Sequence, residues 1–266
     1  MNALHPAWNG LPKVVIGMLH LPALPGAPRA RLDLAQIRAN LLRDVETLAD
    51  GGVHGLMMEN FGDVPFYPNR VPAHVIAQMT ALAGAVRERT EVPLGINVLR
   101  NDGRAALAVA HAVGASFIRV NVLCGARVAD QGLIQGIAHD LLRDRALLGA
   151  ETVKIFADVD VKHSAALATR PIEDEVADVI ERGLAEAVIV SGAGTGKATD
   201  PAQVIQVRSA AGDTPIFIGS GITAETLGQF LASADGFIVG TALKQDGIAT
   251  NPVDAARVRA LMAILR

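Results

Sequence analysis

The chain has 266 residues, enough for one large domain, and half of them are hydrophobic while only 3% are aromatic. A net charge of −3 gives no electrostatic basis for binding nucleic acid. The single cysteine, Cys124, excludes an intrachain disulfide and fits a reducing compartment. We expect a cytoplasmic protein, because the sequence contains neither a secretory signal nor an apolar stretch of about 18 residues that could span a membrane.

Short apolar runs alternate with helical patterns from the start of the chain. The first half contains predicted strands at 14–19, 54–58, 93–98 and 116–121. The intervening helices are predicted at 34–50, 72–89, 102–114 and 136–148, and Asp33 and Asp102 are suited to cap two of them. A polar loop is expected after the fourth strand. A core of Ala, Val, Leu and Ile suits such helices packed on a parallel sheet.

The second half of the chain continues the same alternation. Strands are predicted at 153–158 and 187–190 and within 215–223 and 234–241, and helices begin at Pro171, at Asp200-Pro201, near Thr223 and at Asp254. Eight strand-helix units of about 33 residues each predict a single (β/α)8 barrel over residues 1–266. A doubly wound open sheet is the alternative. It would usually have a glycine fingerprint after the first strand, whereas the glycines here follow strands six to eight.

Two strand ends late in the chain are suited to hold a phosphate group. One strand ends in Gly219, Ser220 and Gly221, and the next ends in Gly240 and Thr241. The amides of such loops, with the start of a following helix, favour an anion, and the last strands of a (β/α)8 barrel commonly bind phosphate. The segment after strand six adds further phosphate-binding candidates, although it lacks the P-loop spacing: Ser191, Gly192, Thr195 and Gly196. The alternative is that these glycines only connect elements.

Acidic and basic residues gather at the carboxyl ends of the predicted strands, where barrel enzymes place their catalytic groups. Asp158, Asp160 and Lys162 share parity, so they face the same way if the strand stays extended. They can serve as acid, base and electrostatic stabiliser, or form a structural salt bridge. Glu59 is a candidate general base or metal ligand, because an unpaired carboxylate on an apolar strand is costly. His163 is expected to titrate near neutrality, or to lie on the surface.

A further group of polar residues at the same strand ends is suited to bind the substrate. The candidates are His20, Asn60, Asn97, Arg119 and Asn121. Arg119 can pair with Glu59 or with Asp158. Whether a metal is used stays open, since Glu59, Asp158 and Asp160 could hold Mg²⁺ together with a substrate phosphate. The sequence has no zinc-binding motif.

Several longer motifs resemble the BtpA/SgcQ family over nearly the whole chain. They are Val15-Ile-Gly-Met-Leu-His-Leu-Pro-Ala-Leu-Pro-Gly26, Glu59-Asn-Phe-Gly-Asp-Val-Pro-Phe66, Gly95-Ile-Asn-Val-Leu-Arg-Asn-Asp102, Phe117-Ile-Arg-Val-Asn-Val122, Asp158-Val-Asp-Val-Lys-His163 and Ile238-Val-Gly-Thr-Ala-Leu-Lys244. The resemblance implies a phosphate-binding (β/α)8 barrel. The family takes its name from a part in photosystem I biogenesis, and other members resemble accessory proteins of sugar metabolism. It implies no catalytic residues.

Two functions follow as hypotheses. The first is an enzyme that acts on a small phosphorylated metabolite, a sugar or nucleoside phosphate, by acid/base chemistry. The second is a non-catalytic assembly factor for a membrane complex, which should expose a large apolar patch on its outer helices. Because barrels often pair through their outer helices, we expect a homo-oligomer.

Overall fold

The computed structural model describes residues 4–192, 194, 195 and 197–265. Within these residues, eight parallel strands close into a barrel in the order β1-β11-β10-β9-β7-β4-β3-β2. These strands are β1 (Val14–His20), β2 (Gly55–Glu59), β3 (Leu94–Asn97), β4 (Phe117–Val120), β7 (Lys154–Val159), β9 (Ala187–Val190), β10 (Ile216–Ile218) and β11 (Gly236–Val239). The predicted (β/α)8 barrel is therefore confirmed.

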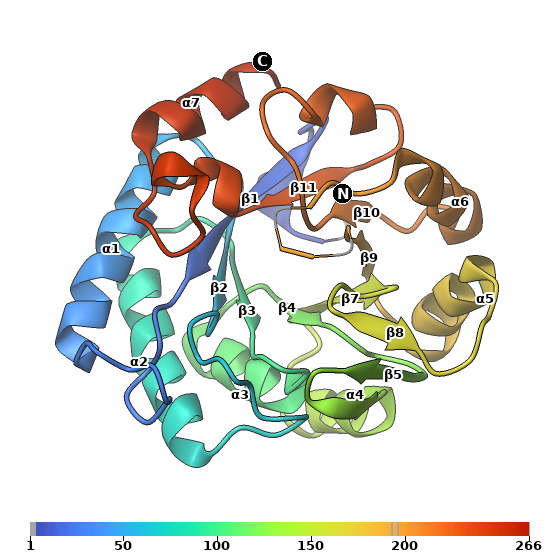
Figure 1. Ribbon diagram of the computed structural model, residues 1–266, viewed down its shortest axis with the longest axis horizontal. Helices are drawn as coiled ribbons and strands as arrows, with labels where there is room; N and C mark the ends of the chain where they lie inside the picture. Colours follow the sequence, from blue (N-terminus) through green and yellow to red (C-terminus); the bar gives the residue numbers. More distant parts are fainter. Residues whose placement is uncertain (1–3, 193, 196, 266) are drawn as a thin grey trace.

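Helices surround the barrel on its outside (Figure 1). They are α1 (Leu34–Asp50), α2 (Ala73–Arg89), α3 (Gly103–Val113), α4 (Ala138–Leu147), α5 (Ile172–Ala177), α6 (Pro201–Ala211) and α7 (Ala255–Ala263), and α5 continues as a π-helical turn, Asp178–Arg182. In the parts of the chain that the structure describes, no helix is both long and apolar enough to cross a membrane.

Aspartate caps begin four of these helices, because each carboxylate accepts hydrogen bonds from backbone amides that have no partner inside the helix. Asp33 accepts from Gln36 N at 2.7 Å, and the Gln36 side chain bonds back to the Asp33 amide. Asp102, Asp200 and Asp254 do the same at the starts of α3, α6 and α7. The helix starts that the sequence predicted from these four residues are confirmed.

Aromatic rings fill the barrel near the amino ends of its strands. The rings of Phe117 and Phe156 stack with centroids 4.6 Å apart, and Phe217 lies 5.0 Å from Phe156. A Cβ on Gly95 would lie 2.1 Å from the Phe117 ring, so this glycine makes room for the phenylalanine. Trp8 covers the cluster, with its Nε1 donating to His54 O at 2.6 Å. This end of the barrel is closed, which leaves the opposite end for a ligand.

The polar loop expected after the fourth strand instead forms part of a small antiparallel sheet. Strands β5 (Ala126–Ala129) and β6 (Gly132–Gln135) form a hairpin, and β8 (Ser164–Ala166) pairs with β5 from the loop that follows β7. The hairpin turns at Asp130 and Gln131, and Gly132 follows with a φ of +93°. A two-residue turn before glycine was the signal for this hairpin, and it was missed because the flanking runs are only four residues long.

The helix expected to start near Thr223 is reduced to one 3₁₀ turn, Leu227–Phe230. Thr223 Oγ1 accepts from the amides of Glu225 and Thr226, and the Thr226 hydroxyl donates to Gly221 O. These side-chain bonds compete with helical hydrogen bonds, and Gly228 further disfavours a helix. The expectation that a full helix N-terminus points at the glycine loop is therefore wrong.

Candidate functional site

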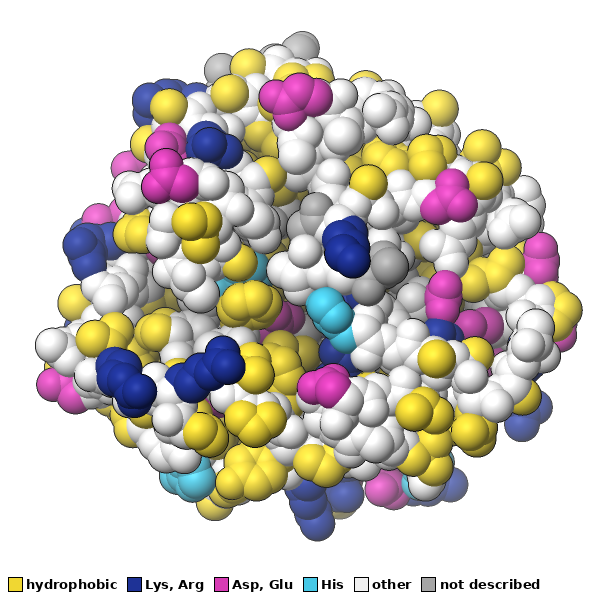
Figure 2. Space-filling model, viewed as in Figure 1, with side chains coloured by type: hydrophobic (Ala, Val, Ile, Leu, Met, Phe, Trp, Pro, Cys, Tyr) yellow, Lys and Arg dark blue, Asp and Glu magenta, His cyan; other side chains and the backbone are white. Residues whose placement is uncertain are grey.

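A cavity of about 480 Å³ opens at the carboxyl ends of the barrel strands, and all eight strands or their following loops contribute to its lining. Figure 2 shows this face hollowed near its centre, with histidine, basic and acidic side chains around the hollow. Of the predicted site residues, the cavity brings together His20, Glu59, Arg119, Asn121, Lys162, His163, Thr195, Gly219, Ser220, Gly221, Gly240 and Thr241. Gly196 lies outside the described residues.

The loops after β10 and β11 form one wall of this cavity mainly from backbone. Gly221 has a φ of +71°, and a Cβ there would lie 2.5 Å from Lys197 O and from Ala198 Cα. The position therefore requires glycine for both its conformation and its packing. Among the described residues, no acceptor bonds to the amides of Gly221, Ile222, Gly240, Thr241 or Ala242. Because these five residues line the cavity, we expect their amides to be available to an anion there.

Ser220 supports this wall from behind. Its Oγ accepts from Gly192 N at 2.7 Å and donates to Lys197 O at 3.2 Å, while Thr199 Oγ1 donates to Ser220 O. Because Ser220 and Gly192 bond to each other, they tie the loop after β9 to the loop after β10. This bond shapes the loops that form the cavity wall.

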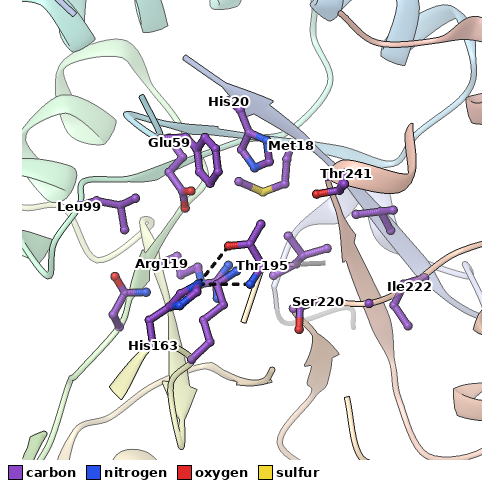
Figure 3. Close-up of a pocket in the computed structure, with 18 of the residues that line it drawn as sticks. Met18, His20, Glu59, Leu99, Arg119, His163, Thr195, Ser220, Ile222 and Thr241 are labelled. Carbon is purple, nitrogen blue, oxygen red and sulfur yellow. Dashed lines mark hydrogen bonds between the residues drawn. The ribbon is translucent and has the colours of Figure 1, made fainter. Parts of the chain in front are cut away.

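Glu59 lies across the mouth from the glycine loops (Figure 3). It is the last residue of β2, it is buried, and Asn97 Nδ2 donates to its Oε2 at 2.5 Å from the neighbouring end of β3. Asn97 thus orients Glu59 and does not line the cavity itself. Asn60 is also directed away: its amide bonds to Leu99 and to Asp63, and so holds the loop after β3.

Arg119 and Asp158 form a buried ion pair at the base of the mouth. Arg119 Nε and Nη2 donate to the two carboxylate oxygens at 2.9 and 2.7 Å. Asn121 Nδ2 and Ser191 Oγ also donate to this carboxylate, at 2.9 and 3.3 Å. With all these donors, Asp158 is suited to hold Arg119 and Asn121 in place and unsuited to take a proton. The sequence predicted that Arg119 pairs with Glu59 or with Asp158, and its partner in the structure is Asp158.

Asn121 keeps one polar atom free at the cavity. Its Oδ1 is buried and has no hydrogen-bond partner among the described residues. Because an unsatisfied buried acceptor costs free energy, this atom is suited to accept a hydrogen bond from a ligand hydroxyl or amine.

Asp160 does not follow the extended strand, so the prediction that it faces the same way as Asp158 and Lys162 does not hold. β7 ends at Val159, and Asp160 has a φ of +48°, so the alternation of an extended strand stops before it. Its carboxylate bonds to Arg127 and to Gln203 and does not line the cavity. The three carboxylates proposed for Mg²⁺ therefore do not surround one point, and the described residues contain no group of three His, Cys, Asp or Glu side chains that could hold a metal ion.

Lys162 and Arg100 bring positive charge to the mouth. Arg100 is buried, and its Nη2 donates to Lys162 O at 2.7 Å. Burial, helped by the nearby Arg119 charge, lowers the pKa of the Lys162 amine to about 8, although Glu59 and Asp158 oppose that shift. Arg100 was not predicted as a site residue, although its place two residues after the predicted strand at 93–98 was a signal for it.

The two histidines of the mouth differ in their surroundings. His20 stacks on Phe61 with centroids 4.4 Å apart, and burial lowers its pKa to about 4, so the ring is neutral at pH 7. His163 is exposed, and its Nε2 lies 3.2 Å from both the hydroxyl and the amide of Thr195 (Figure 3). Partial desolvation of the His163 ring, together with the nearby charges of Lys162 and Arg100, also lowers the pKa of His163. Neither ring is suited to act as a cationic acid at neutral pH.

The sequence matches the BtpA family over residues 11–266. It is 44% identical to an uncharacterized protein of Thermococcus kodakarensis, over 96% of this chain and 95% of that protein. It is also 44% identical to the photosystem I biogenesis protein BtpA of Synechocystis, over 93% of this chain and 86% of that protein.

Solved structures share the fold at low sequence identity. A phosphoribosyl anthranilate isomerase from Thermus thermophilus has a TM-score of 0.58 at 14% identity, with 95% of this chain and 100% of that chain covered. A tryptophan synthase from M. tuberculosis has a TM-score of 0.62 at 18% identity, with 99% of both chains covered. The sequence matches place this protein in a family: the chain belongs to the BtpA family.

Proposed function

We propose that this member of the BtpA family is an enzyme that acts on a small phosphorylated metabolite, a sugar or nucleoside phosphate. The substrate's phosphate group binds to the loops after β10 and β11, and its reacting end lies beside Glu59 and Lys162. The observation that carries the proposal is that one cavity combines a wall of backbone amides, which have no acceptor among the described residues, with an opposite wall of ionisable side chains.

The amide wall suits a phosphate because it offers several donors without bulky side chains. The amides of Gly221 and Gly240 come from two neighbouring strands, so they can reach different oxygens of one group. The isomerase with the same fold is named for a phosphoribosyl compound, which supports a phosphorylated substrate for this protein.

The opposite wall suits proton transfer. Glu59 is buried and held by one neutral donor, Asn97, so its carboxylate keeps acceptor capacity for a substrate proton. Lys162, with a pKa of about 8, can give or take a proton near neutrality. Asp158 acts as a positioning residue, because its oxygens are occupied by Arg119, Asn121 and Ser191. Anchoring at the phosphate supplies the binding energy that orients the reacting end.

Isothermal titration calorimetry with inorganic phosphate, and with a panel of sugar phosphates and nucleoside monophosphates, tests the proposal. Gly221→Ala should weaken phosphate binding by more than 10-fold, since the new Cβ collides with the loop at Ala198. Gly228→Ala is the matched control, because a Cβ there meets nothing within 4 Å. No binding by the wild-type protein, or equal binding by the folded Gly221→Ala variant, would refute the proposal.

A second candidate function is a non-catalytic assembly factor, and the 44% identity to the Synechocystis protein favours it. The equally similar protein of Thermococcus kodakarensis is uncharacterized, so it does not favour either function. Large exposed apolar side chains occur on outer elements, including Leu147 at the end of α4 and Ile205 on α6. If assembly is the function, a Glu59→Gln variant should behave like the wild type in cells that lack the native gene. An enzyme should fail that complementation.

A further inference from the structure

The chain contains few lysines, and their surroundings differ. The five are Lys13, Lys154, Lys162, Lys197 and Lys244. Lys244 Nζ is paired with Asp44 at 2.6 Å, and Lys13 Nζ donates to Ala234 O at 2.5 Å. Lys154 begins β7 at the closed end of the barrel, and Lys197 is exposed. Lys162 is the lysine that lines the mouth cavity.

The Lys162 amine has no counter-ion of its own. Among the described residues, its Nζ forms neither an ion pair nor a hydrogen bond, although it is largely enclosed. The acidic groups that act on it are already engaged, Glu59 by Asn97 and Asp158 by Arg119. A lysine held only for structure would be expected to have a carboxylate partner, as Lys244 has.

The charged groups around Lys162 are Arg119, Arg100, Glu59 and Asp158. The titratable rings of His20 and His163 also lie near it, and both are neutral at pH 7. With a pKa of about 8, about one tenth of the Lys162 amine is neutral at pH 7, whereas an ordinary lysine is neutral in less than about one molecule in a thousand. An amine that is desolvated beside other cations is the usual form of a lysine that attacks a carbonyl group.

We propose that Lys162 forms an imine with the carbonyl carbon of a phosphorylated aldose or ketose bound in the mouth. This inference rests on the proposed function and narrows its substrate class to phosphorylated carbonyl compounds. The position of Lys162 supports this proposal. The amide wall and the Lys162 amine lie in one small cavity with Glu59 and with Asn121, whose Oδ1 has no partner among the described residues.

The steps balance without a co-reactant. The neutral amine attacks the carbonyl carbon, the π bond of the carbonyl group breaks as the C–N bond forms, and a proton passes from the nitrogen to the oxygen to give a carbinolamine. Uptake of one further proton and loss of water leave a protonated imine. This group withdraws electrons from the adjacent carbon, and Glu59 removes a proton there, so the electron pair moves to nitrogen as an enamine. Glu59 then returns a proton to the carbon and regenerates the protonated imine. Addition of water to this imine breaks the C–N bond and, with loss of one proton, releases the carbonyl compound and the neutral amine.

Borohydride trapping on the full-length protein tests the inference. The protein is incubated with D-glyceraldehyde 3-phosphate or dihydroxyacetone phosphate and reduced with sodium borohydride, and the modified lysine is located by peptide mass spectrometry. We expect one adduct per chain, on Lys162, with a rate that rises with pH and is half-maximal near pH 8. Unphosphorylated glyceraldehyde should label Lys162 at least about 10-fold more slowly.

Two arginine variants supply the controls. Lys162→Arg should lose the adduct and still bind inorganic phosphate within about twofold, which shows that the mouth is intact. Lys154→Arg, at the opposite end of the β7 strand that precedes Lys162, should label like the wild type. Phosphate binding without an adduct on Lys162, or adducts spread evenly over the lysines, would overturn the imine and leave the proposed function standing. Labelling of Lys162 that inorganic phosphate does not slow would support the imine and contradict the proposed phosphate site.

Discussion

Arg119 and Asp158 face each other from neighbouring strands, β4 and β7, and two parallel hydrogen bonds join their side chains inside the barrel mouth. The register of the barrel places Arg119 opposite Phe156, so the arginine reaches along β7 toward its carboxyl end to meet Asp158. The pair fixes the direction of Arg119 and removes Asp158 from proton transfer. Glu59 is thereby left as the candidate base.

Asp158→Asn should lower the free energy of unfolding by about 3–5 kcal/mol, because it leaves the Arg119 charge buried without a counter-ion. Asp160→Asn is the control. The Asp160 side chain is 45% exposed, against 0% for Asp158, so its loss should cost less than about 1 kcal/mol. Urea denaturation followed by circular dichroism measures both. Equal effects of the two substitutions would contradict the structural role given to Asp158.

Glu59→Gln should abolish proton transfer while leaving phosphate binding unchanged. The amide keeps the size of the carboxylate and cannot act as a base, so exchange of carbon-bound substrate protons with D₂O should fall by about 100-fold or more. Nuclear magnetic resonance on the sugar phosphates that bind in calorimetry follows this exchange. Glu46→Gln, on the outer helix α1, should exchange like the wild type. Unimpaired exchange by Glu59→Gln would remove this residue from the mechanism.

His20 should make the protein less stable in mild acid. Its pKa is lowered from 6.5 to about 4 in the folded state, so the unfolded chain binds a proton first as the pH falls. Stability is therefore lost between pH 6.5 and 4, by up to about 3 kcal/mol from this group. His20→Phe keeps a ring on Phe61 and cannot titrate. The slope of unfolding free energy against pH should become shallower in this variant, and an unchanged slope would contradict the burial assigned to His20.

Trp8→Ala should destabilise the fold without changing the mouth. Trp8 covers the phenylalanines at the closed end of the barrel and donates a hydrogen bond to His54 O, so its truncation should cost about 3–5 kcal/mol. Thermal unfolding measures the loss. Phosphate affinity, measured below the unfolding transition, should stay within about twofold, and a large loss of affinity would show that the two ends of the barrel are coupled.

Much of the fold could be predicted from local sequence signals. Apolar runs ending in polar residues located the barrel strands, and Asp33, Asp102, Asp200 and Asp254 located helix starts, because strand burial and helix capping depend on a few neighbouring residues. The hairpin of β5 and β6 was missed because each of its strands is only four residues long, and its pairing with β8 could not be predicted because β8 comes from a distant loop. Pairing between strands that are distant in the sequence cannot be predicted from the residues of one short segment.

The candidate site was predictable to a lesser degree. Convergence of strand ends follows from barrel closure, so Glu59 and Lys162 could be placed near Gly221 before the structure was known. Which side chains face the cavity depends on individual hydrogen bonds. Asn60, Asn97 and Asp160 turn to other partners because of contacts with residues far away in the sequence. The roles predicted for Asn60, Asn97 and Asp160 in catalysis or substrate binding stay predictions. The same holds for the roles of the residues that line the cavity.

A crystal structure with bound glycerol 3-phosphate, which has the phosphate group but no carbonyl, tests the central claim most directly. The account predicts phosphate oxygens within about 3 Å of the amides of Gly221 and Gly240, and a carbon chain that extends toward Glu59 and Lys162. A phosphate bound instead among Arg100, Arg119 and Lys162, or a ligand bound only outside the mouth, would contradict it.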